Sequence, residues 1–117
     1  MWFTMRFTSH CVKNSKIVKT ILDELKLPSV MAKVWTTDAI YRETTAKLEA
    51  RKAEGCVAVE MELAGVQAVC DFYEWDLYDF LVTGDVLDQA VYDVSGLANA
   101  NHNMDKLYIA IEIAKRI

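Results

Sequence analysis

The sequence lacks the features that mark several large classes of protein. No Lys/Arg cluster with interleaved aromatic residues occurs, and the net charge is −4, which argues against a nucleic-acid platform. No apolar run reaches about 18 residues, so we expect no membrane span. The opening MWFTMRFTSH has no long apolar core, which argues against a secretory signal peptide. Together these absences favour a cytoplasmic protein with neither nucleic acid nor a membrane as partner.

Metal-binding and redox residues are also scarce. The cysteines stand at 11, 56 and 70 without a CxxC pair, and His10 and His102 are far apart in the sequence. We therefore expect no structural zinc site and no cofactor. An odd cysteine count without a secretory signal indicates reduced thiols. Cys56 and Cys70 are interpreted as small core residues, and both histidines as structural or surface residues.

The 117 residues are enough for one domain. Apolar residues make up 53% and charged residues 26%, which is typical of a folded chain with a core rather than of a disordered one. No internal repeat, low-complexity segment or linker divides the chain. We expect an irregular N-terminal segment over residues 1–13 and one folded unit over 14–117.

Helical and extended patterns alternate along that unit. Apolar spacing and helix-stop signals predict helices from Ser15 to before Pro28, over about 43–53, over 62–75 and from about 101 to the end. Short apolar runs predict strands at 30–35, 56–59 and 77–82, and polar residues with glycine predict a loop over 84–99. Asn14 or Ser15 is expected to cap the first helix. Gly55 stands where a glycine commonly follows a helix.

Each helix also has an expected core face. These faces are Ile17, Val18, Ile21, Leu22 and Leu25 in the first helix, Leu63, Val66, Val69, Cys70 and Tyr73 in the third, and Met104, Leu107, Tyr108, Ile111 and Ala114 in the last.

This alternation predicts an α/β sheet with crossover connections. In such sheets functional groups gather beyond the strand ends. Polar clusters follow the expected strands at residues 36–42, 60–62 and 84–88. We expect the functional site there.

The same clusters carry a family resemblance. The segments TTDAIYRET (36–44), GCVAVEME (55–62) and TGD (83–85), in this order and at these intervals, resemble the nucleoside phosphorylase and uridine phosphorylase superfamily. The resemblance covers roughly residues 14–117, and VEME is its most specific motif. It implies the C-terminal portion of a three-layer α/β/α phosphorylase/hydrolase-like fold with a mixed sheet.

The resemblance implies roles for several residues. Glu62, the second acid of VEME, would hold the ribose 2′- and 3′-hydroxyls, with Glu60 and Met61 beside it. Met61 would pack under the sugar and base. Ile40 stands where the family often has an aromatic residue that stacks on the base. Met61 and Ile40 are equally explained as plain apolar lining.

Three further residues complete the expected site. Asp85 matches an aspartate that protonates the leaving base in purine-specific members, whereas Thr37 and Arg42 match the substrate-binding segment. The chemistry agrees, because a carboxylate accepts two hydrogen bonds from a vicinal diol and a proton donor relieves the charge that develops on the base. For Asp85 to donate at neutral pH, partial burial must raise its pKa.

Each assignment has a simpler explanation. Glu62 at a helix start is also a favourable charge against the helix dipole. Asp85 beside a glycine is typical of a turn. Asp38 can brace its loop. Arg42 with Glu43 can form a surface pair of small energetic value.

The sequence departs from the family's pattern in its N-terminal part. There the family carries a glycine-containing loop and arginines that bind phosphate, and Arg6 has no such loop around it. Thr44 and Ala46 replace the Gln and Arg that uridine phosphorylases use on uracil, and 86–99 has no Arg. We expect that the usual phosphate site is not assembled from this chain alone. We expect a homo-oligomer, or a separate N-terminal fragment, to cover exposed apolar surface.

Three functions stay open at this point. The first is a pentosyltransferase that cleaves a nucleoside with phosphate as acceptor, truncated and weak or inactive by itself. The second is a non-catalytic remnant or interaction module of the same fold. The third is a hydrolytic nucleosidase, which needs no phosphate.

Overall fold

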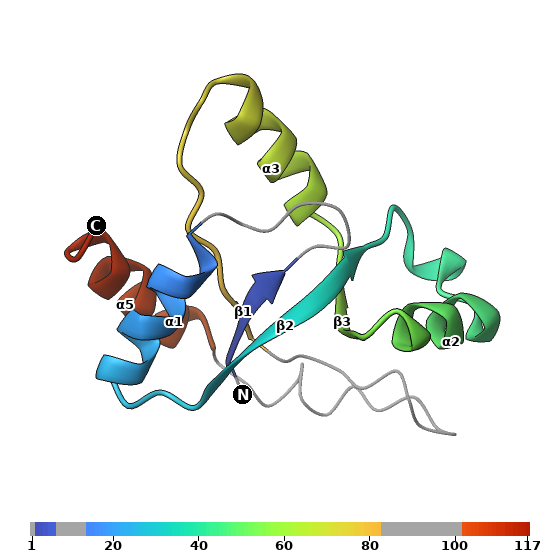
Figure 1. Ribbon diagram of the computed structural model, residues 1–117, viewed down its shortest axis with the longest axis horizontal. Coiled ribbons are helices and arrows are strands. Elements are labelled where there is room, and N and C mark those ends of the chain that lie inside the picture. Colours follow the sequence, from blue (N-terminus) through green and yellow to red (C-terminus); the bar gives the residue numbers. More distant parts are fainter. Residues whose placement is uncertain (1, 7–13, 83–101) are drawn as a thin grey trace.

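A four-stranded mixed sheet lies at the centre of the fold. The computed structural model describes residues 2–6, 14–82 and 102–117, and side chains within 14–82 and 104–117. The elements are β1 (Trp2–Arg6), α1 (Ser15–Glu24), β2 (Ser29–Thr36), a 3₁₀ turn η1 (Ile40–Arg42), α2 (Thr45–Ala53), β3 (Cys56–Glu60), α3 (Leu63–Phe72), β4 (Leu81–Val82) and α5 (His102–Ala114) (Figure 1).

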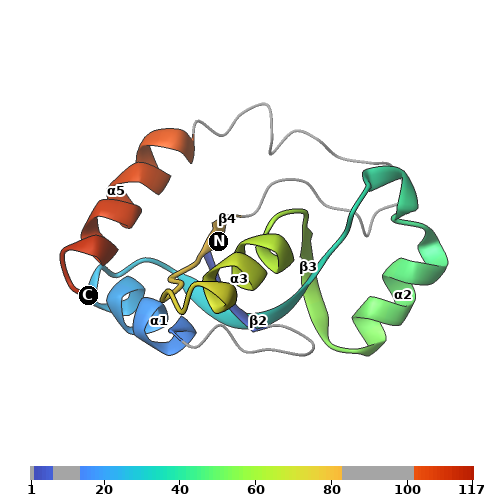
Figure 2. The same ribbon diagram turned by 90° about the horizontal axis from the view of Figure 1, so that it is seen from above.

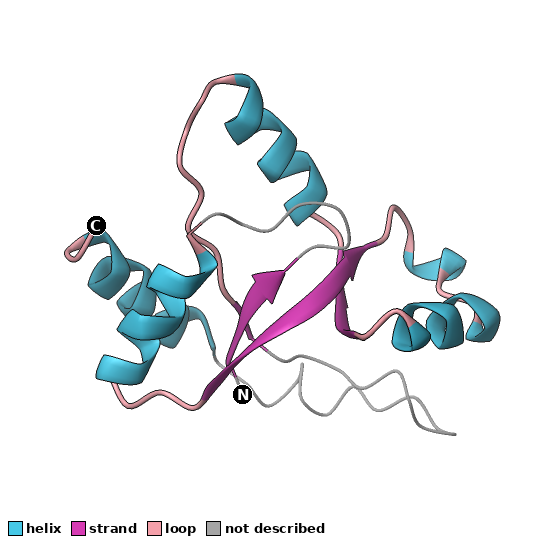
Figure 3. Cartoon of the chain, in the orientation of Figure 1, coloured by secondary structure: helices cyan, strands magenta, loops and turns pink. Residues whose placement is uncertain are grey.

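The strands lie in the order β3-β2-β1-β4. Figure 3 shows strands in magenta at the centre of the molecule, with the helices in cyan around them. β1 pairs with β2 and β2 with β3 in parallel, whereas β4 pairs antiparallel to β1. Parallel neighbours need a crossover, which α1 supplies between β1 and β2 and α2 between β2 and β3. The predicted α/β class with a mixed sheet is confirmed.

Helices cover both faces of the sheet. Val34 and Trp35 are consecutive buried residues of β2, so their side chains point to opposite faces. Val34 packs with Leu63 of α3. Trp35 lies beneath two cations of α2, with Lys47 Nζ 5.5 Å and Arg51 Cζ 5.9 Å from its ring centre. α3 and α2 therefore lie on opposite faces.

The segment before β4 shows the same alternation. Leu77 and Leu81 pack with the cluster that contains Val34, whereas Tyr78 and Phe80 pack against a cluster formed by α1 and α5. Figure 2 shows α1 and α5 side by side at one end of the molecule, with α2 at the other end. The sheet thus has helices on both faces, as expected for a three-layer fold.

The larger core cluster joins α1 to α5. Its members share almost complete burial and are Val18, Ile21, Leu22, Ile109 and Ile113. The α1 residues belong to the predicted apolar stripe, although Ile17 of that stripe is 44% exposed. Burial of each large aliphatic side chain contributes roughly 1.5–3 kcal/mol, so this cluster is a main source of stability.

The predicted core faces of the other two helices were wrong in part. α3 buries Leu63 and Cys70, whereas α5 buries Ile109 and Ile113. The expected core residues that are instead exposed are Val66, Val69, Tyr73, Met104, Leu107, Tyr108, Ile111 and Ala114. Both helices carry apolar residues around much of their circumference, so spacing alone does not determine which side faces the core.

The N-terminal prediction also needs correction. Trp2–Arg6 is a strand rather than an irregular segment, and it lies between β2 and β4. Trp2, Phe3 and Thr4 suit a strand, but the segment lacks the polar alternation that identifies one in a sequence. Its pairing with β2 joins residues far apart in the chain, which no local pattern shows.

The ends of the helices and strands confirm some of the predicted boundaries and caps and contradict others. Gly55 has φ +84° directly after α2, as the predicted C-terminal glycine requires. Asn14 lies at the start of α1 but makes no side-chain cap. Its amide instead donates to Asp76 Oδ1 at 3.3 Å and to the Leu77 carbonyl at 3.1 Å. The predicted strand 77–82 is reduced to Leu81–Val82, and the predicted loop 84–99 lies outside the described residues.

Candidate functional site

Two of the predicted clusters meet at one edge of the sheet. β2 ends at Thr36 and β3 at Glu60, and these two residues are partners in the parallel register. The Thr36 hydroxyl donates to Glu60 Oε1. The same hydroxyl oxygen accepts from the Ala64 N–H at 3.3 Å. The edge of the sheet is thereby joined to the first turn of α3.

Glu60 caps that helix. Its Oε2 accepts from the backbone N–H groups of Glu62 at 2.7 Å and Leu63 at 2.6 Å. These are donors that a helix leaves unpaired at its amino end, and a carboxylate there is also favoured by the helix dipole. Both oxygens of Glu60 are thus engaged within the chain. Direct contact of Glu60 with a substrate stays a prediction.

Glu62 occupies a different position from Glu60. It is the residue that precedes α3, its side chain is exposed, and it makes no side-chain cap. Within the described residues, its Oε2 accepts a 3.2 Å hydrogen bond from the neighbouring Met61 N–H. The dipole explanation considered for Glu62 therefore applies better to Glu60. The Glu62 carboxylate is open to a ligand, with the Met61 side chain, 44% exposed, next to it.

Thr37 is a buried residue that connects the ends of β2 and β3. It is 2% exposed. Its N–H donates to the Glu60 carbonyl at 2.9 Å, and its hydroxyl donates to the Ala39 carbonyl at 3.3 Å. These two hydrogen bonds fix the course of the backbone where it leaves β2. Its contact with a substrate stays a prediction.

The segment after Thr37 presents its side chains to solvent. Arg42 Nη1 donates to Asp38 Oδ2, and both side chains are more than half exposed. The backbone N–H and Arg42 together lower the pKa of Asp38. Asp38 thus braces η1, as the simpler interpretation proposed. Ile40 of η1 is 71% exposed and Tyr41 86%, so both side chains are accessible.

Asp79 is a half-buried acid that the sequence analysis missed. It precedes β4, and its Oδ2 has no hydrogen-bond partner and almost no exposure. Burial, together with the nearby Glu60 carboxylate, raises the pKa of Asp79 to about 6, and a bond from the Phe80 N–H offsets part of this rise. An isolated acid inside the apolar run Leu77–Val82 was the available signal.

The third predicted cluster lies outside the described residues. It contains Asp85, the expected proton donor, and the structure describes nothing of residues 83–101. The role of Asp85 stays a prediction. Cys11 and His10 also lie outside the described residues.

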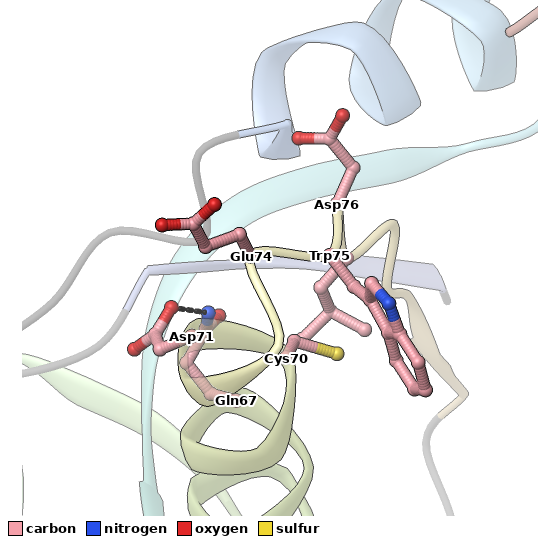
Figure 4. A pocket seen from close by; sticks show the side chains of 7 residues that line it. Gln67, Cys70, Asp71, Glu74, Trp75 and Asp76 are labelled. Atoms are coloured by element: carbon pink, nitrogen blue, oxygen red, sulfur yellow. Dashed lines mark hydrogen bonds between the residues drawn. The ribbon is translucent and has the colours of Figure 1, made fainter.

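A cavity lies at the opposite end of α3. It measures about 270 Å³ and is lined by Gln67, Cys70, Asp71, Glu74, Trp75, Asp76 and Leu77 (Figure 4). α3 has 10 residues and is therefore roughly 15 Å long, which separates the cavity from Glu62. None of the predicted site residues lines it. We therefore place the candidate site at the ends of β2 and β3, where the exposed Glu62 carboxylate lies, and not in this cavity.

Within residues 2–6, 14–82 and 102–117 no group of three or more potential ligands is placed to hold a metal ion. No helix in the described part of the chain is both long and apolar enough to cross a membrane. Cys56 and Cys70 are buried free thiols, as expected of small core residues.

Comparison with known proteins agrees with this geometry. A model of the phosphorylase superfamily matches residues 8–117. Comparison with curated proteins gave no match, and neither did comparison with solved structures. The family match includes both strand ends, the first turn of α3 and the VEME motif. The chain therefore belongs to the phosphorylase superfamily.

Proposed function

We propose that this protein binds a nucleoside and cleaves its N-glycosidic bond, with phosphate as the acceptor. Glu62 holds the 2′- and 3′-hydroxyls of the ribose. One observation carries the proposal: of the two acids of the VEME motif, Glu60 is engaged by Thr36 and the α3 backbone, whereas the Glu62 carboxylate is exposed.

The chemistry of a carboxylate suits a vicinal diol. An ionised carboxylate only accepts hydrogen bonds, and its two oxygens match two neighbouring hydroxyl donors. Charge-assisted bonds of this kind are shorter and about twice as strong as neutral ones. Glu62 also stands on a rigid support, since the α3 amino end is anchored to β2 and β3. A fixed carboxylate orients the sugar for reaction.

Apolar side chains beside Glu62 suit the rest of a nucleoside. Met61 is adjacent in sequence and partly exposed, and Ile40 lies on the exposed turn η1 beyond the same edge of the sheet. A thioether and an aliphatic chain form a surface for a sugar or base without hydrogen-bond specificity. Arg42 is held by Asp38 and remains accessible, so it is available to a polar group of the substrate.

The departing base needs a proton, and we assign its delivery to Asp85. This assignment follows from the family resemblance and is tested by substitution. A hydrolytic nucleosidase is the second candidate, because the Glu62 carboxylate can hold the ribose whether phosphate or water is the acceptor. The two candidates differ in whether base release depends on phosphate.

We propose further that the protein acts as a homo-oligomer. α3 and the turn after it expose large apolar side chains, among them Val69 and Phe72 of the helix and Trp75 of the turn, which are 50%, 79% and 63% exposed. Adjacent exposed apolar side chains are a common feature of subunit interfaces. Size-exclusion chromatography with light scattering at tens of micromolar tests this, and a strictly monomeric protein would contradict it. A tagged N-terminal fragment co-purifying with the chain would instead identify a second polypeptide.

The function is tested by base release from a panel of purine and pyrimidine nucleosides, with and without phosphate. Glu62→Gln should lower kcat/KM at least ~100-fold, because two hydrogen bonds to a charged group contribute roughly 1.5–3 kcal/mol each. Glu49→Gln is the matched control, since Glu49 lies on α2 with a 61% exposed side chain. Its activity should equal that of the wild type.

The outcomes separate the candidates. Release that needs phosphate identifies a phosphorylase, and release without phosphate identifies a nucleosidase. Equal activity of the Glu62→Gln variant would refute the assigned role of Glu62. A wild-type protein that neither binds nor cleaves any nucleoside would refute the proposed function and favour a non-catalytic member of the family.

A further inference from the structure

We propose that the homo-oligomer is a two-fold dimer in which the carboxyl end of α3 in one copy packs on the amino end of α1 in the second copy. Phe72, Tyr73 and Trp75 supply the apolar centre of this contact, and the acids beside them bind Lys16 of the second copy. The inference rests on the proposed homo-oligomer and names the surfaces that meet in it. It does not depend on the proposed cleavage of nucleosides.

The carboxyl end of α3 carries three aromatic rings that contact one another at the surface. The ring centres of Phe72 and Tyr73 are 4.9 Å apart with an interplanar angle of 86°, and those of Tyr73 and Trp75 are 4.9 Å apart with an angle of 22°. The three residues are 79%, 56% and 63% exposed. Contact between the rings restricts their motion, so little conformational entropy is lost when a partner covers them. Aromatic residues of this kind commonly supply most of the binding energy of an interface.

The surroundings of these rings are acidic. No Lys or Arg occurs between Cys56 and Asn101, and the last turn of α3 has no basic residue. Asp71 and Glu74 lie there instead, both exposed, although the negative end of a helix dipole disfavours carboxylates. A partner surface that brings a cation to this end of α3 is therefore attracted. The same surface of a second copy would only add further carboxylates and is repelled.

A cavity among these groups suits a single cationic side chain. It measures about 270 Å³, and Asp71, Glu74 and Trp75 are among the residues that line it. In Figure 4 the two carboxylates lie on one side and the indole of Trp75 on the other. The volume is below the ~300–1,000 Å³ that is typical of pockets for whole small molecules. A lysine ammonium placed here meets two carboxylates and an indole, which are favoured neighbours of a cation.

The amino end of α1 has the complementary character. Its first turn contains no acid, although the positive end of a helix dipole favours one. Lys16 lies in this turn with an exposed side chain, and Ile17 beside it is 44% exposed. Each of the two helix ends therefore carries charge of the sign that its own dipole disfavours. Contact between two copies offsets both, and Ile17 adds apolar surface for the aromatic rings.

The two surfaces are connected on one subunit, which permits a closed dimer. The Asn14 amide, directly before α1, donates to Asp76 Oδ1 and to the Leu77 carbonyl, in the segment that follows the aromatic rings. Figure 1 shows this segment running from the end of α3 to the start of α1. A two-fold axis then repeats the contact, with α3 on α1 in both directions.

The area of the aromatic surface also requires a second contact. Given their exposure, the three aromatic residues present roughly 400 Å² to solvent. Each partner of a stable interface buries ~800 Å². The aromatic rings therefore make up about half of an interface, and the amino end of α1 on the same subunit supplies further area.

An exchange of charge between two variants tests the pairing. Sedimentation velocity measures the dimer Kd of the full chain at low salt. Glu74→Lys and Lys16→Glu should each raise this Kd at least ~10-fold, because each places like charges in both contacts of the dimer. An equimolar mixture of the two variants should restore the wild-type Kd, because the mixed dimer joins opposite charges in both contacts. Glu49→Lys makes the same change of charge at an exposed position of α2 and should leave the Kd unchanged.

A second pair of variants tests the apolar centre. Phe72→Ser and Trp75→Ser should each raise the dimer Kd at least ~30-fold, which is the loss expected for an aromatic residue at the centre of an interface. Tyr41→Ser is the matched control, since Tyr41 lies on η1 and is 86% exposed, and its Kd should equal that of the wild type. The circular dichroism spectrum of each variant should match that of the wild type, because the replaced side chains are exposed.

The outcomes separate the inference from the rest of the proposed function. A mixture of the two charge variants that associates as weakly as either alone would overturn the pairing of Lys16 with Glu74. Dimers that are unaffected by Phe72→Ser and Trp75→Ser would overturn the α3 interface and leave the homo-oligomer standing. A wild type that stays monomeric at tens of micromolar, or that binds a separate polypeptide through Trp75 instead, would overturn both. Base release from nucleosides is measured independently, so its failure leaves the interface standing.

Discussion

Substitution of Asp79 by Asn should remove a pH dependence from the free energy of unfolding. Burial and Glu60 raise the pKa of Asp79 from its ordinary value of 3.8 to about 6 in the folded chain. Asn has the same shape as the neutral acid and keeps an oxygen that accepts from the Phe80 N–H. The variant therefore resembles the protonated wild type at every pH.

The sign follows from proton binding. Between about pH 4 and 6 the folded chain holds a proton on Asp79 that the unfolded chain has lost, because the folded-state pKa is the higher one. The stability due to this proton is fully present below pH 3.8 and is lost as the pH rises through 6. A rise of about two pKa units corresponds to ~3 kcal/mol in total. Of this, ~1.4 kcal/mol falls between pH 5 and 8.

The assay is urea unfolding at several pH values between 5 and 8, followed by circular dichroism and tryptophan fluorescence. Relative to Asp79→Asn, the wild type should lose ~1.4 kcal/mol across this range. The variant should be the more stable protein at pH 8. Asp105→Asn serves as the charge control. A variant that is less stable than the wild type at pH 8, or one with the same pH slope, would refute the reasoning.

Three further substitutions test the packing and the turns. Leu22→Ala empties a fully buried position between α1 and α5 and should cost about 3–4 kcal/mol in the free energy of urea unfolding; a cost below 1 kcal/mol would contradict the described core. Asn14→Ala leaves the Leu77 carbonyl without its 3.1 Å donor and should cost about 1–2 kcal/mol, with Asn14→Asp as the comparison that keeps the size. Gly55→Ala should cost about 1 kcal/mol through its φ of +84° alone, since an added Cβ meets no atom within 4 Å; a stabilised variant in thermal unfolding would show that the turn has another conformation.

The candidate site was predictable where the local sequence fixes the geometry. VEME follows an apolar run and precedes a helix, so Glu62 had to lie near a strand end and a helix start. The first two clusters do meet, because parallel neighbouring strands end at the same edge of the sheet. The different contacts of Glu60, which caps α3, and of Glu62, which is exposed, were not predictable. It depends on which carboxylate reaches Thr36 of another strand.

Local rules were also sufficient for most element boundaries and for the turn at Gly55. Helix stop signals, a left-handed glycine and the apolar stripe of α1 all act over a few residues, and the sequence alone contains them. The α/β class followed from their alternation. These features need no knowledge of what packs against them.

Tertiary structure decided what depends on contacts between distant parts of the chain. β1 exists because Trp2–Arg6 pairs with β2 on one side and β4 on the other. α5 is apolar on several sides, and packing against α1 determines that Ile109 and Ile113 are its buried residues. The pKa of Asp79 rises because folding buries its carboxyl group and, to a smaller extent, because of the negative charge of Glu60 on β3. Burial and the proximity of like charges exist only after folding, so they lie beyond any pattern within a single element.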